Sequence, residues 1–380
     1  MQAAWQQRSV EKRSDGRRFP YSAPVTAAPS ERSHWPGLDG FRGIAALAVL
    51  AFHVHLGPAV NGYVGVDVFF ALSGFLITSI LLREIDRTGR LRFARFYIRR
   101  ALRLLPALAA VSLAVFVVGV AAGRAAEFGR GALAAMVYLA NWWMYTGRPA
   151  PLLDHTWTLA IEEHFYVVWP VLLVGLCAGR RWIRVLTALV AVAIVAVVLT
   201  PWPEPITNVR STYLRGFPII WGSLLAAAAR WPIAQERGHL LRWPATGALV
   251  VLLALLCIPW QLPERWLTGP TSGAGLLALL VLGGIVLAPS SPAAALLSGR
   301  LMRWAGTRSY GLYLYHFPIL QILRHQVDVG PEWARMVLGI VVSIAMTEAS
   351  FRWLESPFLR LKDRLGPSAT ARPAPLGSAG

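Results

Sequence analysis

The sequence predicts an all-α polytopic membrane protein with about ten transmembrane helices and one re-entrant or interfacial segment. Hydrophobic residues make up 56% of the 380 positions and charged residues only 15%, whereas soluble domains average about 45–50% and about 25%. Apolar runs of roughly membrane-spanning length alternate with arginine-rich segments. These observations exclude a soluble Rossmann-type enzyme, a secreted disulfide scaffold and a disordered polymer.

Eleven apolar runs are candidates for transmembrane helices, which typically need about 20 residues each. They lie at 41–57, 62–82, 104–122, 131–147, 157–177, 182–200, 211–229, 244–261, 272–290, 308–324 and 333–354. Arginine-rich segments follow or precede them, in the N-terminal tail and at 83–103, 180–184, 230–242, 300–303 and 352–364. Because positive residues favour the cytoplasmic side, we expect all of these segments on one side of the membrane.

That arrangement requires one run between 104 and 157 not to cross. The weakest run is 131–147, which is short and carries Asn141, Trp142 and Trp143. We therefore predict a re-entrant or interfacial segment at 131–156, ten true spans and two cytoplasmic termini. The alternative is eleven spans with the C-terminus outside. Irregular backbone at membrane depth needs protein or water around it, so a re-entrant segment would mark a cavity.

Residues 1–37 are rich in Arg, Ser and Pro and lack the apolar core of a signal peptide, and 361–380 are of low complexity. We expect two disordered cytoplasmic tails around a membrane domain at 38–360. The net charge of +18 is spread over the membrane-flanking segments, which disfavours a nucleic-acid partner. Cys177 and Cys257 both lie in apolar runs and imply neither a disulfide nor a metal site.

A polar side chain within a span is costly, by about 2.5–3.5 kcal/mol on insertion scales, so each one is a functional candidate. In the first span His53 follows Arg42 by eleven residues. Eleven residues make nearly three helical turns, so both side chains share a face about 16 Å apart along the axis. Arg42 can meet an anion near the cytoplasmic surface, and an imidazole, with an unperturbed pKa of about 6.5, suits general-base work at His53. The alternative is a hydrogen bond from His53 between helices, with Arg42 reaching the membrane surface.

One further polar residue, Asp67, is predicted at a depth comparable to that of His53, and a histidine is found in a later span. Asp67 lies near the outer end of the second span, where it could orient an imidazole or pair with another buried group. His316 lies in SYGLYLYHFP (309–318), whose tyrosines are expected to pack. We predict that His316 lines the site.

The block 83–103 is the densest in charge, and in it Arg100 and Arg103 are spaced i, i+3. On a helix they would be neighbours, and two forked guanidiniums are a good receptor for phosphates. The alternative is that they anchor the chain at the membrane surface, as the other arginines of this block do.

A polar stripe is predicted in HTWTLAIEEHFYVVWP (155–170), where polar side chains recur at helical spacing. They are His155, Thr158 or Leu159, Glu162 and Tyr166. A buried Glu needs a partner, and Arg42, His53 and Arg215 are available to Glu162. No second ligand group lies at i+4, so the spacing does not indicate a zinc site.

Six blocks of the sequence stand in a characteristic order. They are GLDGFRGIAALAVLAFHVH with Arg42 and His53, GYVGVDVFFALSGFLIT with Asp67, FYIRRALRLLPA with Arg100 and Arg103, HTWTLAIEEHFYVVWP, SYGLYLYHFP and FRWLESPF. Together they resemble the membrane-bound acyltransferase-3 family, the bacterial O-acyltransferases of surface polysaccharides and related acceptors. The resemblance covers about residues 37–360.

The resemblance implies that Arg42, Arg100 and Arg103 hold the phosphates of coenzyme A or otherwise secure the acyl donor. It implies that His53 is the catalytic base and that Glu162 supports the site, beside Asp67 as a second acidic candidate. Three positions depart from the family pattern: His164 replaces a Gln, Thr158 replaces a Ser, and Phe217 stands where an Asp often follows Arg215. We expect the acceptor or pocket lining to comprise His155, Trp157, His164, Tyr166, Arg215 and His316.

The function that the resemblance implies is O-acyl transfer in a bacterial plasma membrane. An acyl group, by default acetyl, would move from acyl-CoA to a hydroxyl of a carbohydrate, expected to be a cell-envelope glycan or glycolipid, without a metal. Both direct transfer and a covalent acyl-histidine route are open. A separate extracytoplasmic protein could handle the acceptor. The alternatives are a macrolide or other secondary metabolite as acceptor, and a membrane transporter with a polar path but no visible repeat.

Overall fold

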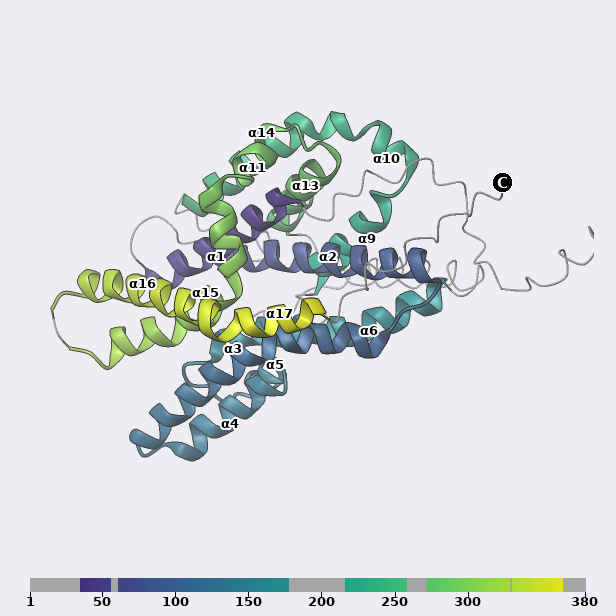
Figure 1. The fold of residues 1–380 in the computed structure, drawn as a ribbon. Coiled ribbons are helices and arrows are strands. Elements are labelled where there is room, and N and C mark those ends of the chain that lie inside the picture. Colours follow the sequence, from purple (N-terminus) through teal and green to yellow (C-terminus); the bar gives the residue numbers. More distant parts are fainter. Residues whose placement is uncertain (1–34, 56–60, 178–215, 258–271, 329, 365–380) are drawn as a thin grey trace, which may run out of the picture.

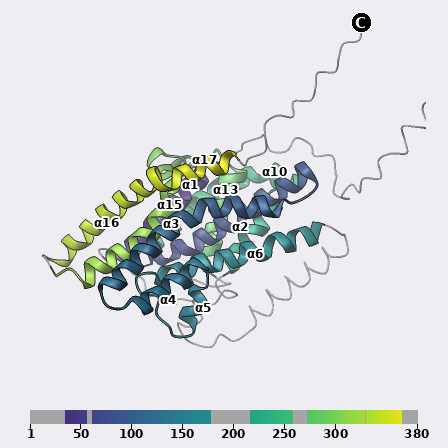
Figure 2. The ribbon, with the colours of Figure 1, turned by 60° about the horizontal axis from the view of Figure 1, so that its bottom comes forward.

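The computed structural model describes residues 35–55, 61–177, 216–257, 272–328 and 330–364. All regular elements within these residues are helices, and none is a strand. Figure 2 shows the longest helices side by side with their axes in a similar direction. The all-α class predicted from the sequence is therefore confirmed.

The helices follow the order of the predicted apolar runs (Figure 1). The longer ones are α1 (Pro36–Val54), α2 (Gly65–Thr88), α3 (Phe93–Ala121), α6 (Trp157–Cys177), α11 (Arg242–Cys257), α13 (Gly273–Leu287), α15 (Arg300–His325) and α16 (Glu332–Ala349). The shorter ones are α4 (Ala125–Met136), α5 (Ala140–Tyr145), α9 (Phe217–Ala228), α10 (Pro232–Glu236), α14 (Pro292–Leu297) and α17 (Ser356–Arg364). Single 3₁₀ turns occupy Gly62–Val64, Asp154–Thr156 and Gly238–Leu241, and a π-helical turn occupies Ser350–Glu355.

Six helical stretches among the described residues are long and apolar enough to cross a membrane. They are Pro36–Val54, Gly62–Thr88, Phe93–Ala121, Asp154–Val174, Gly238–Cys257 and Glu332–Arg364. The chain is therefore a multi-pass membrane protein. The span predicted at 182–200 and part of the one at 211–229 lie outside the described residues.

Helix α15 contains the run predicted at 308–324 but is not among those six stretches. It packs against α1, α3 and α16, and its polar side chains Ser309, Tyr313 and His316 are buried. Polar groups at membrane depth are tolerated when they face protein rather than lipid. The low hydropathy of α15 thus follows from its position inside the bundle.

Helices α1 and α15 run parallel and in very close contact. A Cβ atom added to Gly306 of α15 would lie 1.7 Å from the carbonyl oxygen of Asp39, and one added to Gly43 of α1 would lie 2.5 Å from that of Met302 in α15. Small residues let membrane helices approach this closely, because packing rather than water drives their association. The contact fixes the register between the two helices, and with it the depth at which their functional side chains meet.

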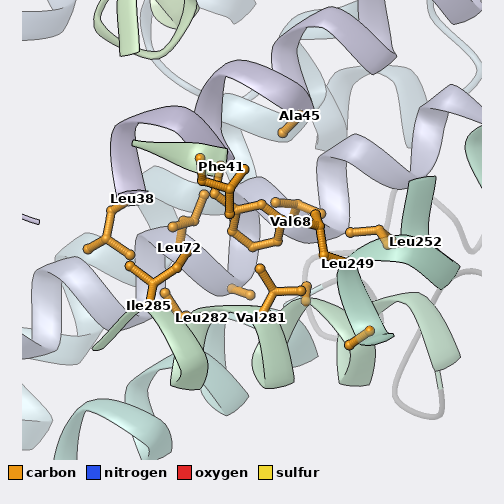
Figure 3. Close-up of a cluster of buried hydrophobic side chains, with 14 of the residues drawn as sticks. Leu38, Phe41, Ala45, Val68, Leu72, Leu249, Leu252, Val281, Leu282 and Ile285 are labelled. Atoms are coloured by element: carbon orange, nitrogen blue, oxygen red, sulfur yellow. The ribbon is translucent and has the colours of Figure 1, made fainter. Parts of the chain in front are cut away.

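The opposite face of α1 packs into a core shared with α2, α11 and α13 (Figure 3). Phe41, Leu72 and Val281 are among its fully or almost fully buried members. Since α1 is covered on two faces, it is a central element of the bundle. Side chains on α1 are consequently held in a rigid setting.

The segment predicted to be re-entrant forms α4, α5 and the turn before α6. Helix α4 packs along the second half of α3, with Gly119 against Phe128, and the chain then returns past Ala150, which lies against Gly131. At 12 and six residues, neither α4 nor α5 has the length of a typical span. That this segment is re-entrant or interfacial, and does not cross the membrane, stays a prediction.

Candidate active site

Three histidines from distant parts of the chain meet at one end of the bundle: His53, His155 and His316, here called the histidine cluster. The Nδ1 atom of His53 lies 3.2 Å from Nε2 of His316, and the ring centroids of His155 and His316 are 5.7 Å apart. His316 is 1% and His155 4% exposed. Among the described residues no group of three His, Cys, Asp or Glu side chains has the geometry to hold a metal ion.

Each histidine is placed by a different element. His53 lies in the last turn of α1, which ends at His55 in a left-handed conformation. His316 lies in α15, two residues before Pro318, and His155 lies in the 3₁₀ turn that leads into α6. The parallel packing of α1 and α15 brings His53 and His316 to the same depth.

Tyr313 of α15 forms hydrogen bonds to the start of α6. Its hydroxyl donates a hydrogen bond to the carbonyl oxygen of His155 and lies 2.6 Å from Oγ1 of Thr158. Thr158 therefore supplies a hydroxyl at the position where the family pattern has a Ser. The arrangement fixes the backbone that carries His155.

Phe317 forms an apolar wall of the histidine cluster. Its ring centroid lies 5.1 Å from that of His53 and 4.9 Å from that of His155. Both ring nitrogens of His155 are buried, and the ring lies within hydrogen-bonding range of the backbone of Leu314. One ring nitrogen of His155 is consequently left for a ligand.

Three arginines gather at the other end of the bundle: Arg42, Arg100 and Arg103, here called the arginine cluster. Nε of Arg100 donates a 2.6 Å hydrogen bond to Oε1 of Glu163, and the guanidinium lies 3.3 Å from the centroid of the Tyr166 ring. Arg42 lies 3.9 Å from the carboxylate of Asp39. Two of the three cations thus have an acidic neighbour.

Arg103 has no ion pair among the described residues, and the charges of Arg42 and Arg100 act on it repulsively. Its side chain is exposed. A cation that faces two other cations is stabilised by an anion placed between them. This geometry suits the binding of phosphate groups better than surface anchoring alone.

Glu162 lies with the arginine cluster. It accepts a 2.8 Å hydrogen bond from Ser73, and the positive charges of Arg100 and Arg42 act on it. The hydrogen bonds of His53, by contrast, go to Val49 and His316. Glu162 therefore lies near the arginines that are expected to bind the acyl donor. Its predicted catalytic role stays a prediction.

The polar stripe predicted for 155–170 extends from one cluster to the other. His155 lies at the histidine cluster, Thr158 contacts Tyr313, Glu162 contacts Ser73, and Tyr166 stacks on Arg100. From His155 to Tyr166 a helical rise covers roughly 16 Å. This matches the separation of Arg42 and His53 on α1, so two elements connect the clusters.

The other predicted site residues are dispersed. Asp67 is completely buried in the first turn of α2. Trp157 packs beside the apolar groups around Tyr313, and His164 lies close to the backbone of Tyr138. Arg215 lies outside the described residues.

Sequence reasoning missed three contributors to the site. Glu163 pairs with Arg100, Tyr313 holds His155, and Tyr138 extends from the segment between α4 and α5 to within electrostatic range of Arg100 and Glu163. Tyr138 has a φ of 56°, which is uncommon for a bulky residue and often marks a functional site. The adjacent Glu pair hinted at Glu163, whereas nothing in the local sequence indicated Tyr138.

Comparison with known proteins assigns the family of the chain. Residues 35–347 match the family described as Acyltransferase domain, so the chain belongs to that family. The resemblance drawn from the six sequence blocks is thereby confirmed. No solved structure matches the chain.

Curated relatives are bacterial. The chain is 34% identical over 350 residues to YrhL of Bacillus subtilis, provisionally named a peptidoglycan O-acetyltransferase, covering 85% of this chain and 54% of YrhL. It is 30% identical over 358 residues to the peptidoglycan O-acetyltransferase OatA of Listeria monocytogenes, covering 86% and 56%. The chain therefore spans little more than half the length of these relatives.

Proposed function

We propose that this protein transfers an acetyl group from acetyl-CoA to a hydroxyl of a cell-envelope glycan, with peptidoglycan as the first acceptor to test. The observation that carries the proposal is the pairing of an anion-binding cluster and an imidazole cluster on one face of α1, joined by the polar stripe of α6. The names of the curated relatives support the choice of acceptor. The reaction would take place in the bacterial plasma membrane.

The arginine cluster would hold the donor on the cytoplasmic side, where acyl-CoA is made. Arg103 and Arg42 would contact the phosphates, and Arg100, already neutralised by Glu163, would position the others. The long pantetheine arm would then extend along the polar stripe of α6. This places the thioester near the histidine cluster, at the far end of α1.

At the histidine cluster, His53 would act as general base. Its Nε2 takes the proton as the acceptor oxygen attacks the thioester carbon, and the tetrahedral intermediate expels the thiolate of coenzyme A, which takes up that proton. His155, whose ring lies beside the backbone of Leu314, would hydrogen-bond the acceptor through its other nitrogen. The same Nε2 would be the atom acylated if the reaction followed a covalent route instead.

The acceptor lies on the opposite side of the membrane in this proposal. The segment around α4 and α5 would line the entry for the glycan, because it returns to His155 at that end. His164, close to Tyr138 in this segment, would affect the fit of the substrate rather than the chemical step. A separate extracytoplasmic protein would be needed if the acetyl group goes to a distant acceptor.

The experiment is thiol release from acetyl-CoA by the purified protein in detergent, with soluble peptidoglycan fragments, an unrelated oligosaccharide and a macrolide as acceptors. We expect release that depends on His53 and rises with the peptidoglycan fragments. His239→Ala is the matched control, since His239 is exposed and, within the described part of the chain, hydrogen-bonds to the nearby carbonyl of Glu236 alone. Wild-type turnover by His53→Ala would contradict the assignment of the base, and stimulation by the macrolide alone would contradict the acceptor.

A further inference from the structure

We infer that His316 is a positioning residue that holds His53 in one tautomer and shares the proton that His53 removes. The inference rests on the proposed function, because it concerns how His53 acts as a base. No carboxylate is hydrogen-bonded to either imidazole among the described residues. The role that an Asp performs in a Ser-His-Asp triad would here fall to a second imidazole.

The surroundings of His316 determine which of its nitrogens carries hydrogen. Its Nδ1 lies 3.0 Å from the carbonyl oxygen of Leu312 and 2.8 Å from that of Tyr313. A carbonyl oxygen only accepts hydrogen bonds, so Nδ1 must be the donor. A neutral imidazole has one N–H group, and Nε2 of His316 therefore presents a lone pair toward His53.

The same reasoning fixes the tautomer of His53. Its Nδ1 lies 2.9 Å from the carbonyl oxygen of Val49 and 3.2 Å from the lone pair of His316 Nε2. Both neighbours are acceptors, so Nδ1 of His53 carries the hydrogen. Its Nε2 is then unprotonated, which is the state a general base requires.

The pair also provides a place for the charge that develops during transfer. When the acceptor O–H bond breaks and its proton binds Nε2 of His53, the Nδ1–H of His53 becomes a stronger donor to Nε2 of His316. The positive charge is then spread over two rings, and the proton returns through Nε2 of His53 to the leaving thiolate. Atoms and charge balance without any further reactant.

The two imidazoles cannot both be charged at this distance, because like charges 3.2 Å apart in a buried site repel strongly. They should therefore titrate as a pair that takes up a single proton. The other groups that face the pair are His155, His55 and Arg324, whose charges act on its members. Arg324 is itself paired with Glu332, and His55 lies at the end of α1.

Three substitutions at position 316 separate positioning from packing. Gln places an amide oxygen near the position of Nε2 and can accept from His53, but it cannot take a proton. Asn can supply only the N–H donor to the carbonyl oxygens of Leu312 and Tyr313. Leu can supply neither that donor nor the acceptor for His53. We expect kcat to fall about 10-fold in His316→Gln and about 10³-fold in both His316→Asn and His316→Leu.

The readouts are kcat, KM for acetyl-CoA and the pH profile of kcat/KM, measured on variants that elute as single species in detergent. We expect an unchanged KM in all three, because the arginine cluster is untouched, and a wild-type acid limb that reports one proton. Equal kcat values in all three variants, or a two-proton acid limb, would overturn the inference. If His53→Ala alone is inactive while His316→Leu keeps wild-type kcat and pH profile, this inference fails and the proposed function stands; full activity of His53→Ala overturns both.

Discussion

The arginine cluster and the histidine cluster lie at opposite ends of α1 and deal with charge in different ways. At the first, permanent cations are partly neutralised by carboxylates, as in the pair of Arg100 and Glu163. At the second, hydrogen bonds run to backbone carbonyls and to another imidazole. Under the proposed function, the first end holds a ligand that is always charged, and the second carries a charge only while a proton is in transit.

This difference between the two clusters predicts that the largest loss of activity follows removal of the general base. His53→Ala should lower kcat by about 10³-fold, within the range usual for loss of a general base, and leave KM for acetyl-CoA unchanged. Steady-state thiol release over a range of acetyl-CoA concentrations measures both constants. A rise in KM with an unchanged kcat would mean that His53 helps to bind acetyl-CoA. The two clusters would then not have separate roles.

The contact between α1 and α15, which sets the depth of His53 relative to His316, should be nearly as sensitive. In Gly306→Ala the new methyl group would collide with the carbonyl oxygen of Asp39, forcing the helices apart. We expect a large loss of activity, about 10²-fold, together with a lower thermal-unfolding midpoint in detergent.

The matched control is Gly247→Ala in α11, where an added Cβ meets nothing within 4 Å. Its midpoint should stay level or rise slightly, since Ala favours helix over Gly. If both variants behave alike, close packing of α1 on α15 does not set the geometry of the site.

Within the arginine cluster, the paired and unpaired cations should respond differently. Arg100→Ala leaves the carboxylate of Glu163 without its partner in a largely buried position, which should cost on the order of 2–3 kcal/mol of stability. Arg103→Ala breaks no ion pair of the described residues and should raise KM for acetyl-CoA about 10-fold without lowering the unfolding midpoint.

The double variant Arg100→Ala/Glu163→Ala sharpens this contrast, because it removes both members of the pair. It should recover part of the stability that Arg100→Ala loses, and the thermal midpoints of the four proteins in the cycle measure the coupling. Strictly additive midpoints would mean that the pair contributes nothing of its own.

The smallest loss of activity is expected at Tyr313, which connects α15 to the start of α6. Tyr313→Phe removes the hydroxyl that bonds to the carbonyl of His155 and to Thr158, while keeping the ring. We expect kcat to fall about 3–10-fold, in keeping with about 1 kcal/mol for one hydrogen bond, and KM for the glycan acceptor to rise. An unchanged acceptor KM would show that His155 needs no such support.

Part of each cluster could be predicted from local spacing. The eleven-residue interval between Arg42 and His53, and the i, i+3 pair at Arg100 and Arg103, follow from helical periodicity alone. The polar stripe of 155–170 follows in the same way. The helices themselves were predictable wherever their lipid-facing surface made them apolar.

What local pattern could not supply was the pairing between distant helices. His53 and His316 are separated by 263 residues, and their contact depends on glycines that let α1 and α15 approach. The position of Tyr138 depends on how α4 packs on α3, and its unusual backbone conformation leaves no mark in the sequence. The apolar run at 308–324 predicted part of helix α15, but it did not show that the polar residues of this helix face the protein interior.

The account is tested most directly by measuring acetyl-CoA binding and thiol release in parallel, by calorimetry and by initial rates, on three proteins: the wild type, His53→Ala and Arg42→Ala/Arg103→Ala. We predict that His53→Ala binds acetyl-CoA as the wild type does and releases thiol about 10³-fold more slowly. The double arginine variant should bind at least 10-fold more weakly and keep most of its kcat at saturating donor. Loss of binding in His53→Ala, or wild-type binding in the arginine variant, would contradict the division of the site into a donor-holding end and a proton-transferring end.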